Sequence, residues 1–368
     1  MANRDLRKAQ QGKNDEFYTQ FRDIEVEMNA YLDYNQDVFR DKTILLPCDD
    51  PEWSNFTKYF ALKFEALGIK KLISTSYAPW SKKMILGGLF SEFEKNSPQF
   101  DADKSRTNGK IFILDRDVTG DGRINIDDLQ WQYLEGDGDF RSAEVTALRD
   151  EADIIITNPP FSLFRDFLSW IVEADKQFII IGNMNAITYK ETFSMIMYNK
   201  IWLGSTIHSG DREFEVPKEY PVKAAGWRID DSGRKFLRVK GVRWFTNIEH
   251  GRRHEMLPLM SMSDNLRYSR HKEIKGKIAY DRYDNYDAID VPYTDAIPSD
   301  YDGVMGVPIS WLDKYCPEQF EIIGMPDNIN TCNNSKVKAL MIPNQAKYDR
   351  PYINGERKYP HILIRKKR

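Results

Sequence analysis

The chain has 368 residues, 41% of them hydrophobic and 30% charged, and a formal net charge of -3 at pH 7. No run approaches the roughly 18 consecutive apolar residues of a membrane-spanning helix, and three distant cysteines exclude a disulfide framework. The length exceeds the ~100–200 residues of one usual domain, so we expect a large core with an added module. The polar start lacks the apolar stretch of a signal peptide, and we expect a cytoplasmic protein.

The first part of the chain alternates between helix and strand patterns. Residues 24–34 predict a short helix and residues 43–47 a buried strand, and an amphipathic helix follows from the cap Ser54 to the stop Gly68. Further apolar runs predict strands at residues 71–75, 111–114, 154–156 and 178–181, and a helix at 163–172. This order predicts an α/β fold with a doubly wound, mostly parallel, Rossmann-like sheet.

The alternation stops near Leu203. The later pieces are short, charged and rich in Tyr, Pro and Asp, except for residues 242–247, which predict a strand that returns to the sheet. We therefore expect one domain over residues 1–204 and a second region over residues 205–368. Ligands of such sheets bind at the carboxyl ends of the strands, so functional side chains should follow strands.

The sequence Asn158-Pro159-Pro160-Phe161 comes directly after the predicted strand 154–156. An amino group on an aromatic ring is a poor nucleophile, because its lone pair is delocalised. The Asn158 side-chain oxygen and the Pro159 carbonyl could accept its N–H bonds and let the nitrogen become tetrahedral, and the two prolines stiffen this array. Phe161 could stack on a base that has left the duplex. The loop therefore predicts methylation of a ring amine, with these four residues as the catalytic group.

Other interpretations of this loop remain open. A proline-stiffened loop can simply lead into a helix, and the same four residues occur in enzymes that methylate protein glutamine. An RNA or protein amine is therefore an alternative substrate, and an inactive DNA-binding module is a third possibility.

A methyl donor should bind near this loop. Displacement on a sulfonium methyl requires positioning and electrostatic stabilisation more than a metal ion, and this predicts S-adenosylmethionine as the cofactor. The candidate cofactor-binding residues lie in three short segments: Phe17 and Tyr18, then Cys48, Asp49 and Asp50 after the first strand, and finally Asp139 and Phe140 in a Gly-Asp-Gly-Asp-Phe loop.

Positive charge is concentrated between residues 223 and 282. Fifteen basic side chains there face seven acidic ones, with aromatic residues interleaved, which suits a nucleic-acid backbone and its bases. A solvated protein surface is the alternative. The candidate DNA-binding residues are Arg228, Arg234, Lys235, Arg238, Lys240, Arg252, Arg253, Arg267, Arg270 and Lys272.

One segment resembles a calcium-binding loop in the spacing of its oxygen-bearing side chains. Asp117, Thr119, Asp121, Asn125 and Asp128 have the spacing of oxygen ligands, with a glycine at the sixth position. Position 3 of the loop is Thr rather than Asp, and position 12 is Asp rather than the usual Glu, so an Asp- and Gly-rich turn is the alternative. We expect no catalytic metal.

Taken together, these motifs closely resemble the EcoRI-type adenine-specific DNA methyltransferases of restriction-modification systems. The matching segments run in order along most of the chain: DEFYTQ at 15–20, CDDP at 48–51, GDGDFRS at 136–142, TNPPFSLF at 157–164, ITYK at 187–190, KIWLG at 200–204, DNYDAI at 284–289, GVMGVP at 303–308 and ILIRKKR at 362–368. Residues 78–135 do not match, and no acidic residue ends the second strand.

The resemblance implies a monomeric, metal-independent enzyme that binds double-stranded DNA. It implies that an adenine is flipped out of a specific site and methylated on its exocyclic amino group, with the recognition elements after the catalytic loop. Residues 1–204 would then form the catalytic, S-adenosylmethionine-binding domain and residues 205–368 the target-recognition region. A separate cognate restriction endonuclease is a possible partner.

Overall fold

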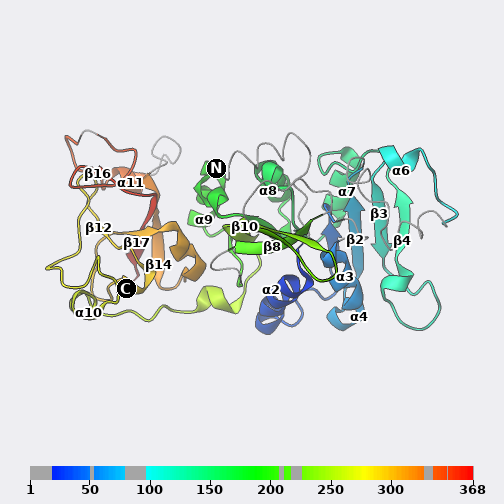
Figure 1. Cartoon of the computed structure of the whole chain (residues 1–368), viewed down its shortest axis with the longest axis horizontal. Coiled ribbons are helices and arrows are strands. Elements are labelled where there is room, and N and C mark those ends of the chain that lie inside the picture. The colour runs from blue at the N-terminus through cyan, green and yellow to red at the C-terminus, as the bar shows by residue number, and fades with distance from the viewer. Residues whose placement is uncertain are drawn as a thin grey trace. The chain divides into compact units, whose positions relative to one another are not determined.

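A computed structural model describes residues 19–49, 54–78, 97–206, 211–216, 226–326, 335–345 and 347–367 (Figure 1). The chain divides into two compact units. The first contains residues 1–186 and 209–249, and the second contains residues 187–208 and 250–368. This division differs from the expected boundary after Gly204, because residues 209–249 return to the first unit. None of the helices in the described ranges combines the length and apolarity that a membrane crossing needs.

The first unit is built on a central sheet. Its strands follow the order β4-β3-β2-β1-β5-β6-β11. The four central strands are parallel: β2 Lys71–Ser76, β1 Thr43–Leu46, β5 Ile154–Thr157 and β6 Gln177–Asn183. Their apolar runs are buried, as expected of parallel strands covered on both faces.

Antiparallel strands extend this sheet on both sides. On one side lie β3 Lys110–Leu114 and β4 Gln130–Tyr133, and on the other lies β11 Val242–Thr246, which pairs with β6. The prediction of an α/β fold with a large central sheet is confirmed. The parallel arrangement is confined to the central strands, because β3 and β4 form a meander with β2.

Helices of the first unit bury apolar side chains in its core. They are α2 Phe21–Tyr34, α3 Asn55–Leu62, α4 Phe64–Leu67, α7 Ala143–Glu151 and α8 Phe164–Glu173. The short helix α6 Lys104–Thr107 contains no apolar residue. The Ser54 hydroxyl caps α3 by accepting the Phe56 N–H at 3.1 Å. The helix expected from Ser54 to Gly68 is interrupted at Lys63, where α3 ends and α4 begins.

A small antiparallel sheet completes the first unit. Its order is β8-β10-β9, with β8 Asp211–Val216, β9 Trp227–Ile229 and β10 Lys235–Lys240. Phe214, Leu237 and Trp227 lie directly opposite one another across the three strands, so they share one face. Phe214 is buried, whereas Trp227 is about half exposed.

The second unit has its own sheet, in the order β12-β13-β17-β14. Its strands are β12 Ile289–Asp290, β13 Met305–Pro308, β14 Phe320–Gly324 and β17 His361–Lys366. The remaining elements are α9 Lys190–Met197, β7 Trp202–Leu203, α10 Met262–Tyr268, α11 Ser335–Lys338, β15 Tyr352–Ile353 and β16 Glu356–Arg357. Tyr283, Tyr286 and Leu363 belong to its core.

Short 3-10 helices connect these elements. They are η2 Ile126–Asp128, η3 Phe161–Leu163, η4 Met184–Thr188, η5 Gly251–His254, η6 Thr294–Ala296 and η7 Ile309–Lys314. Of these, η3 directly follows the first three residues of the predicted catalytic loop.

Candidate active site

The Asn158–Phe161 loop leaves the carboxyl end of β5. Because β1, β2 and β5 are parallel, their carboxyl ends lie along one edge of the sheet. Pro159 is buried, and Asn158 and Phe161 are partly exposed. The Pro160 carbonyl accepts the Leu163 N–H at 2.9 Å, so the loop passes directly into η3. The local sequence therefore holds Asn158 at the ligand-binding edge.

Asp49 joins the strand ends on which this loop rests. Its side chain is 6% exposed. One carboxylate oxygen accepts the Ser54 hydroxyl at 2.7 Å, and the other accepts the Thr157 hydroxyl at 2.5 Å. Its backbone N–H donates to the Thr75 carbonyl at 3.1 Å, and the Ser74 hydroxyl donates to its carbonyl. Asp49 thus ties together β1, β2, β5 and the start of α3.

This bonding gives Asp49 a supporting role that sequence reasoning missed. Ser54 and Thr157 were not recognised as its partners; the available signal was a hydroxyl residue immediately before Asn158. The neighbouring Cys48 is partly buried and forms no disulfide. The remaining candidates in these segments, Phe17, Tyr18 and Asp50, lie outside the described residues.

The loop over residues 136–140 packs against the end of β2. Gly138 has a φ of +82°, and a Cβ there would lie 2.3 Å from the Ser76 carbonyl oxygen. The Ala78 N–H donates to the Asp137 carbonyl at 2.7 Å. Only glycine fits this approach, since a side chain would meet both the carbonyl and an unfavourable backbone conformation. The Gly-Asp-Gly sequence therefore brings Asp139 to the same edge as Asn158.

Asp139 and Phe140 have different surroundings. The Asp139 carboxylate accepts two hydrogen bonds from the Arg141 guanidinium, at 2.9 and 2.7 Å, and its side chain keeps 26% exposure. The Phe140 ring is buried, with its centroid 5.0 Å from that of Phe167 and 5.5 Å from that of Trp170. Phe140 packs as a core residue here, and Asp139 remains accessible.

Aromatic packing fixes both ends of the Asn158–Phe161 loop. The Phe161 ring meets Phe214 of β8 edge to face, with centroids 6.4 Å apart. Beyond the loop, Phe164 lies against Gly182 of β6, where a Cβ would come within 2.3 Å of its ring. The Phe164 ring also contacts Phe245 at 5.0 Å. The loop is thus held between the large sheet and the small β8-β10-β9 sheet.

Half of the candidate DNA-binding residues belong to the small sheet or its connecting turn. They are Arg228, Arg234, Lys235, Arg238 and Lys240. Arg228 binds Glu213 with contacts of 2.7 to 3.1 Å, and this hydrogen bonding lowers the pKa of Glu213. Arg234 binds Asp230 at 2.7 Å, and both guanidinium groups lie over the Phe236 ring. Lys235 lies over the Trp227 ring at 5.5 Å. This surface combines cations with aromatic side chains.

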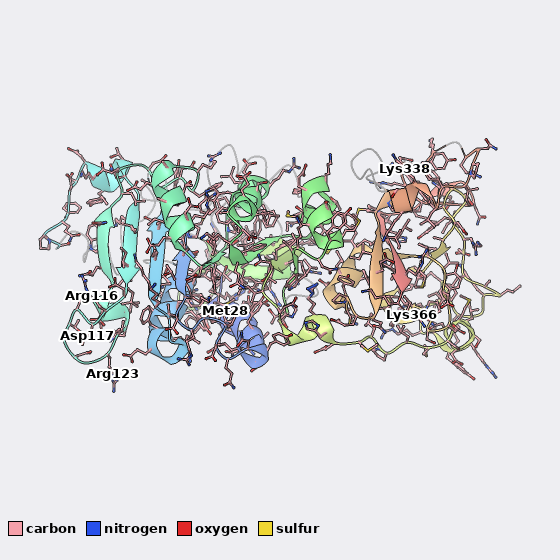
Figure 2. The ribbon with its side chains drawn as sticks, turned by 180° about the vertical axis from the view of Figure 1, so that it is seen from behind. Met28, Arg116, Asp117, Arg123, Lys338 and Lys366 are labelled. Carbon is pink, nitrogen blue, oxygen red and sulfur yellow. The ribbon has the colours of Figure 1, made fainter. Side chains whose placement is uncertain are left out.

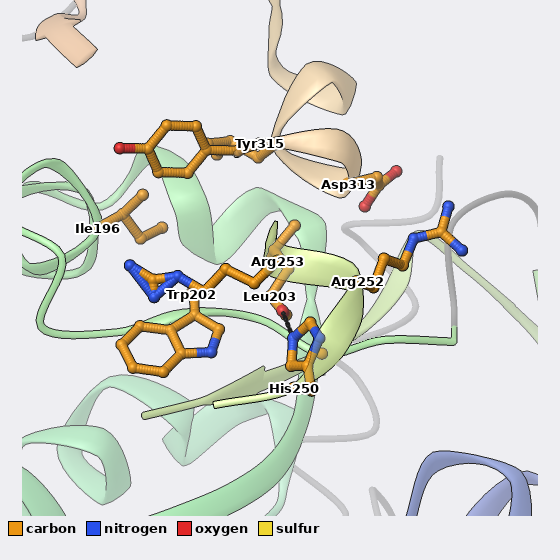
Figure 3. A pocket seen from close by; sticks show the side chains of 10 residues that line it. Ile196, Trp202, Leu203, His250, Arg252, Arg253, Asp313 and Tyr315 are labelled. Atoms are coloured by element: carbon orange, nitrogen blue, oxygen red, sulfur yellow. Dashed lines mark hydrogen bonds between the residues drawn. The ribbon is translucent and has the colours of Figure 1, made fainter. Parts of the chain in front are cut away.

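The other five candidates belong to the second unit. They are Arg252, Arg253, Arg267, Arg270 and Lys272. Arg253 is buried, and its guanidinium carbon lies 3.7 Å from the Trp202 ring centroid (Figure 3). It also donates to Asn199 at 2.9 Å. The adjacent His250 bonds the Leu203 carbonyl at 3.0 Å. Burial lowers the pKa of His250 to about 4. Arg252 and Arg253 both line a small cavity, whereas Arg267, Arg270 and Lys272 are exposed.

The calcium-like segment folds as a turn closed by its own backbone. Asp117, which Figure 2 labels, accepts the N–H groups of Gly120 and Gly122 at 2.5 and 2.8 Å. Asp128 accepts those of Val118, Thr119 and Asn125 at 2.9 to 3.0 Å, and these bonds lower the pKa of Asp128 to about 2. In the described part of the chain no group of three or more His, Cys, Asp or Glu residues is placed to hold a metal ion.

A parallel sheet that presents an Asn-Pro-Pro-Phe loop at the carboxyl end of a central strand defines an amine-directed methyltransferase. The family described as adenine-specific methyltransferase EcoRI matches residues 5–367. The chain belongs to this family and is an adenine-specific DNA methyltransferase. The prediction from the sequence motifs is confirmed, and an RNA or protein substrate is not favoured.

Three relatives share nearly their whole length with this chain. The Type II methyltransferase M.EcoRI of Escherichia coli is 40% identical, over 100% of this chain and 97% of that protein. M.MpnI of Mycoplasma pneumoniae is 32% identical over 98% and 97%, and M.MgeORF184P of Mycoplasma genitalium is 31% identical over 98% of both. No solved structure matches the chain.

Proposed function

We propose that the chain transfers a methyl group from S-adenosylmethionine to the exocyclic amino group of an adenine that is flipped out of a specific duplex site. The observation that carries this proposal is the position of Asn158. It follows β5 at the ligand-binding edge, and its loop is supported through the Thr157–Asp49 hydrogen bond. The preference for adenine follows from membership of the family.

The proposed chemistry is a direct displacement. The Asn158 Oδ1 and the Pro159 carbonyl accept the two N–H bonds of the adenine amino group, so its nitrogen can become tetrahedral and attack. The N–C bond forms as the bond from carbon to sulfur breaks, and the extra amino proton passes to solvent. Phe161 stacks on the extruded base. These groups act by position and electrostatics, which is why rigidity from two prolines is useful.

The methyl donor fits the edge formed by the ends of β1 and β2 and the loop 136–140. When bound, S-adenosylmethionine supplies an electrophilic sulfonium methyl. Asp139 is partly exposed at this edge, and its carboxylate suits the hydroxyl or amino donors of that molecule. Asp49 is nearly buried and already accepts two hydroxyls, so we assign it to holding the edge. Cys48 lies beside it in the chain.

Candidate DNA contacts lie in each of the two units. We propose that the β8-β10-β9 sheet contacts the backbone beside the flipped adenine, because its Phe214 touches Phe161. The second unit would provide further phosphate contacts and the target recognition. Salt-dependent binding is then expected, since phosphate contacts release counterions. We further propose a cytoplasmic monomer, with a separate restriction endonuclease as its partner in the cell.

The test uses an expressing host and a single substitution. Sequencing of host DNA should reveal methylated adenines in one short sequence, and a duplex with that sequence should accept labelled methyl groups from S-adenosylmethionine. Asn158→Ala should abolish transfer while the variant still binds the duplex and unfolds at the wild-type temperature. Methylation of RNA or protein instead of DNA, or undiminished turnover by Asn158→Ala, would contradict the proposal.

A further inference from the structure

One segment of the second unit, residues 266–280, displays apolar side chains among cations. We call it the basic loop. Ile278 is 101% exposed, the highest value among the large apolar side chains that the structure describes, and Tyr268 is 60% exposed. Single exposed apolar residues are common and require no explanation on their own. The surroundings of Ile278 distinguish it from such cases.

The basic loop is anchored on both sides of Ile278. Ile274 is 2% exposed and Tyr280 is 7% exposed, so both flanks enter the core. The Gly276 N–H donates to the Leu266 carbonyl at 2.8 Å, and the Tyr280 hydroxyl donates to the Ala296 carbonyl at 2.7 Å. Ile278 is thus presented between two fixed points.

The charge of the basic loop is strongly positive. It contains five Lys or Arg residues and one acid, Glu273. Arg270 pairs with Asp295 at 2.9 Å, and Lys277 pairs with Asp281 at 2.5 Å. The other three, Arg267, Lys272 and Lys275, make no ion pair with any residue in the described ranges; Arg267 lies over the Tyr268 ring at 5.2 Å. Three cations therefore remain available for an external anion.

An apolar tip among unpaired cations fits DNA. Phosphates would meet the cations, and an apolar side chain can enter a groove and partly unstack a base step, which kinks the duplex. We propose that Ile278 is such a wedge, that Tyr268 packs beside it against sugar or base, and that Arg267, Lys272 and Lys275 hold the flanking phosphates. This inference rests on the proposed function, because it requires a duplex substrate.

The test compares two exposed branched side chains. Ile278→Ala removes the wedge, and Leu62→Ala removes a 62% exposed leucine from α3 as the matched control. Both variants should unfold near the wild-type temperature, since both side chains are largely exposed. With the methylated sequence identified as above, Ile278→Ala should bind the duplex about tenfold more weakly, as expected for loss of a buried aliphatic contact. Leu62→Ala and Ile278→Leu should bind like the wild type.

A second readout reports the wedge directly. 2-Aminopurine placed at each position of the duplex should become fluorescent at one step besides the target adenine, and Ile278→Ala should abolish only that second signal. Lys272→Ala and Lys275→Ala should each reduce the salt dependence of binding by about one phosphate contact, whereas Ile278→Ala should leave it unchanged.

The outcomes separate the two proposals. If the wild type does not methylate any duplex, the proposed function fails. If it methylates the duplex and Ile278→Ala retains both the affinity and the second fluorescence signal, only the wedge is refuted. Loss of binding to anionic lipid vesicles by Ile278→Ala, with unchanged DNA binding, would also overturn the wedge.

Discussion

The Thr157 hydroxyl donates a 2.5 Å hydrogen bond to the Asp49 carboxylate, although 108 residues separate the two in the chain. Thr157 is the last residue of β5, and Asp49 lies just beyond the end of β1. The bond therefore couples two neighbouring parallel strands at the point where each turns toward the ligand-binding edge.

Thr157→Val should test this coupling. The substitution keeps the shape but leaves a buried carboxylate oxygen of Asp49 without its donor, which should lower the free energy of unfolding by about 1–3 kcal/mol. Turnover should fall about tenfold or more, because Asn158 follows directly and its placement would shift. Urea unfolding and methyl transfer measure the two effects. Thr157→Ser retains the hydroxyl, so its unfolding free energy and turnover should be close to those of the wild type. Equal values for Thr157→Val and Thr157→Ser would contradict the coupling.

Gly138→Ala should disrupt the loop beside β2. The added Cβ would lie 2.3 Å from the Ser76 carbonyl oxygen at a φ of +82°, so both a clash and backbone strain arise. The expected loss of unfolding free energy is about 2 kcal/mol or more. Gly120→Ala is the control, since its φ is +76° but nothing lies within 4 Å of the added atom, and strain alone should cost about 1 kcal/mol. Similar losses in the two variants would contradict the close approach at Ser76.

His250 should make stability depend on pH. Burial lowers the pKa of His250 to about 4 in the folded state, below its usual 6.5. The unfolded chain then binds more protons between these values, so stability should rise with pH through this window and fall on acidification, by at most about 3 kcal/mol. His250→Gln can still donate to Leu203 without titrating. The free energy of unfolding should differ less between pH 7 and pH 5 in this variant than in the wild type. If the difference is the same in both proteins, His250 is not its cause.

Calcium should leave the protein's thermal stability unchanged. The carboxylates of Asp117 and Asp128 accept backbone N–H groups, which close the turn without an ion. Neither excess calcium chloride nor a chelator should shift the melting temperature. Asp128→Ala should lower it, because three N–H groups lose their acceptor. A melting temperature that rises with calcium and returns with chelator would show a bound ion instead.

Local patterns predicted the elements that carry the site. The apolar run before Asn158 predicts β5, and the cap at Ser54 predicts the start of α3, because both depend on neighbouring residues. The meander of β3 and β4 was not predicted, since an apolar run does not specify the direction of its strand. The basic segment was recognised as a whole, yet its residues divide between the two units.

The sequence by itself determined the family, which matches residues 5–367, and it places an Asn-Pro-Pro-Phe loop directly after a buried strand. These features depend on residue type and short-range geometry. Only the tertiary structure decided that Asp49 supports the edge, that Phe140 enters the core and that Arg253 lies over Trp202. Each of these depends on partners distant in the chain, and strand order and side-chain packing select such partners only when the whole unit folds.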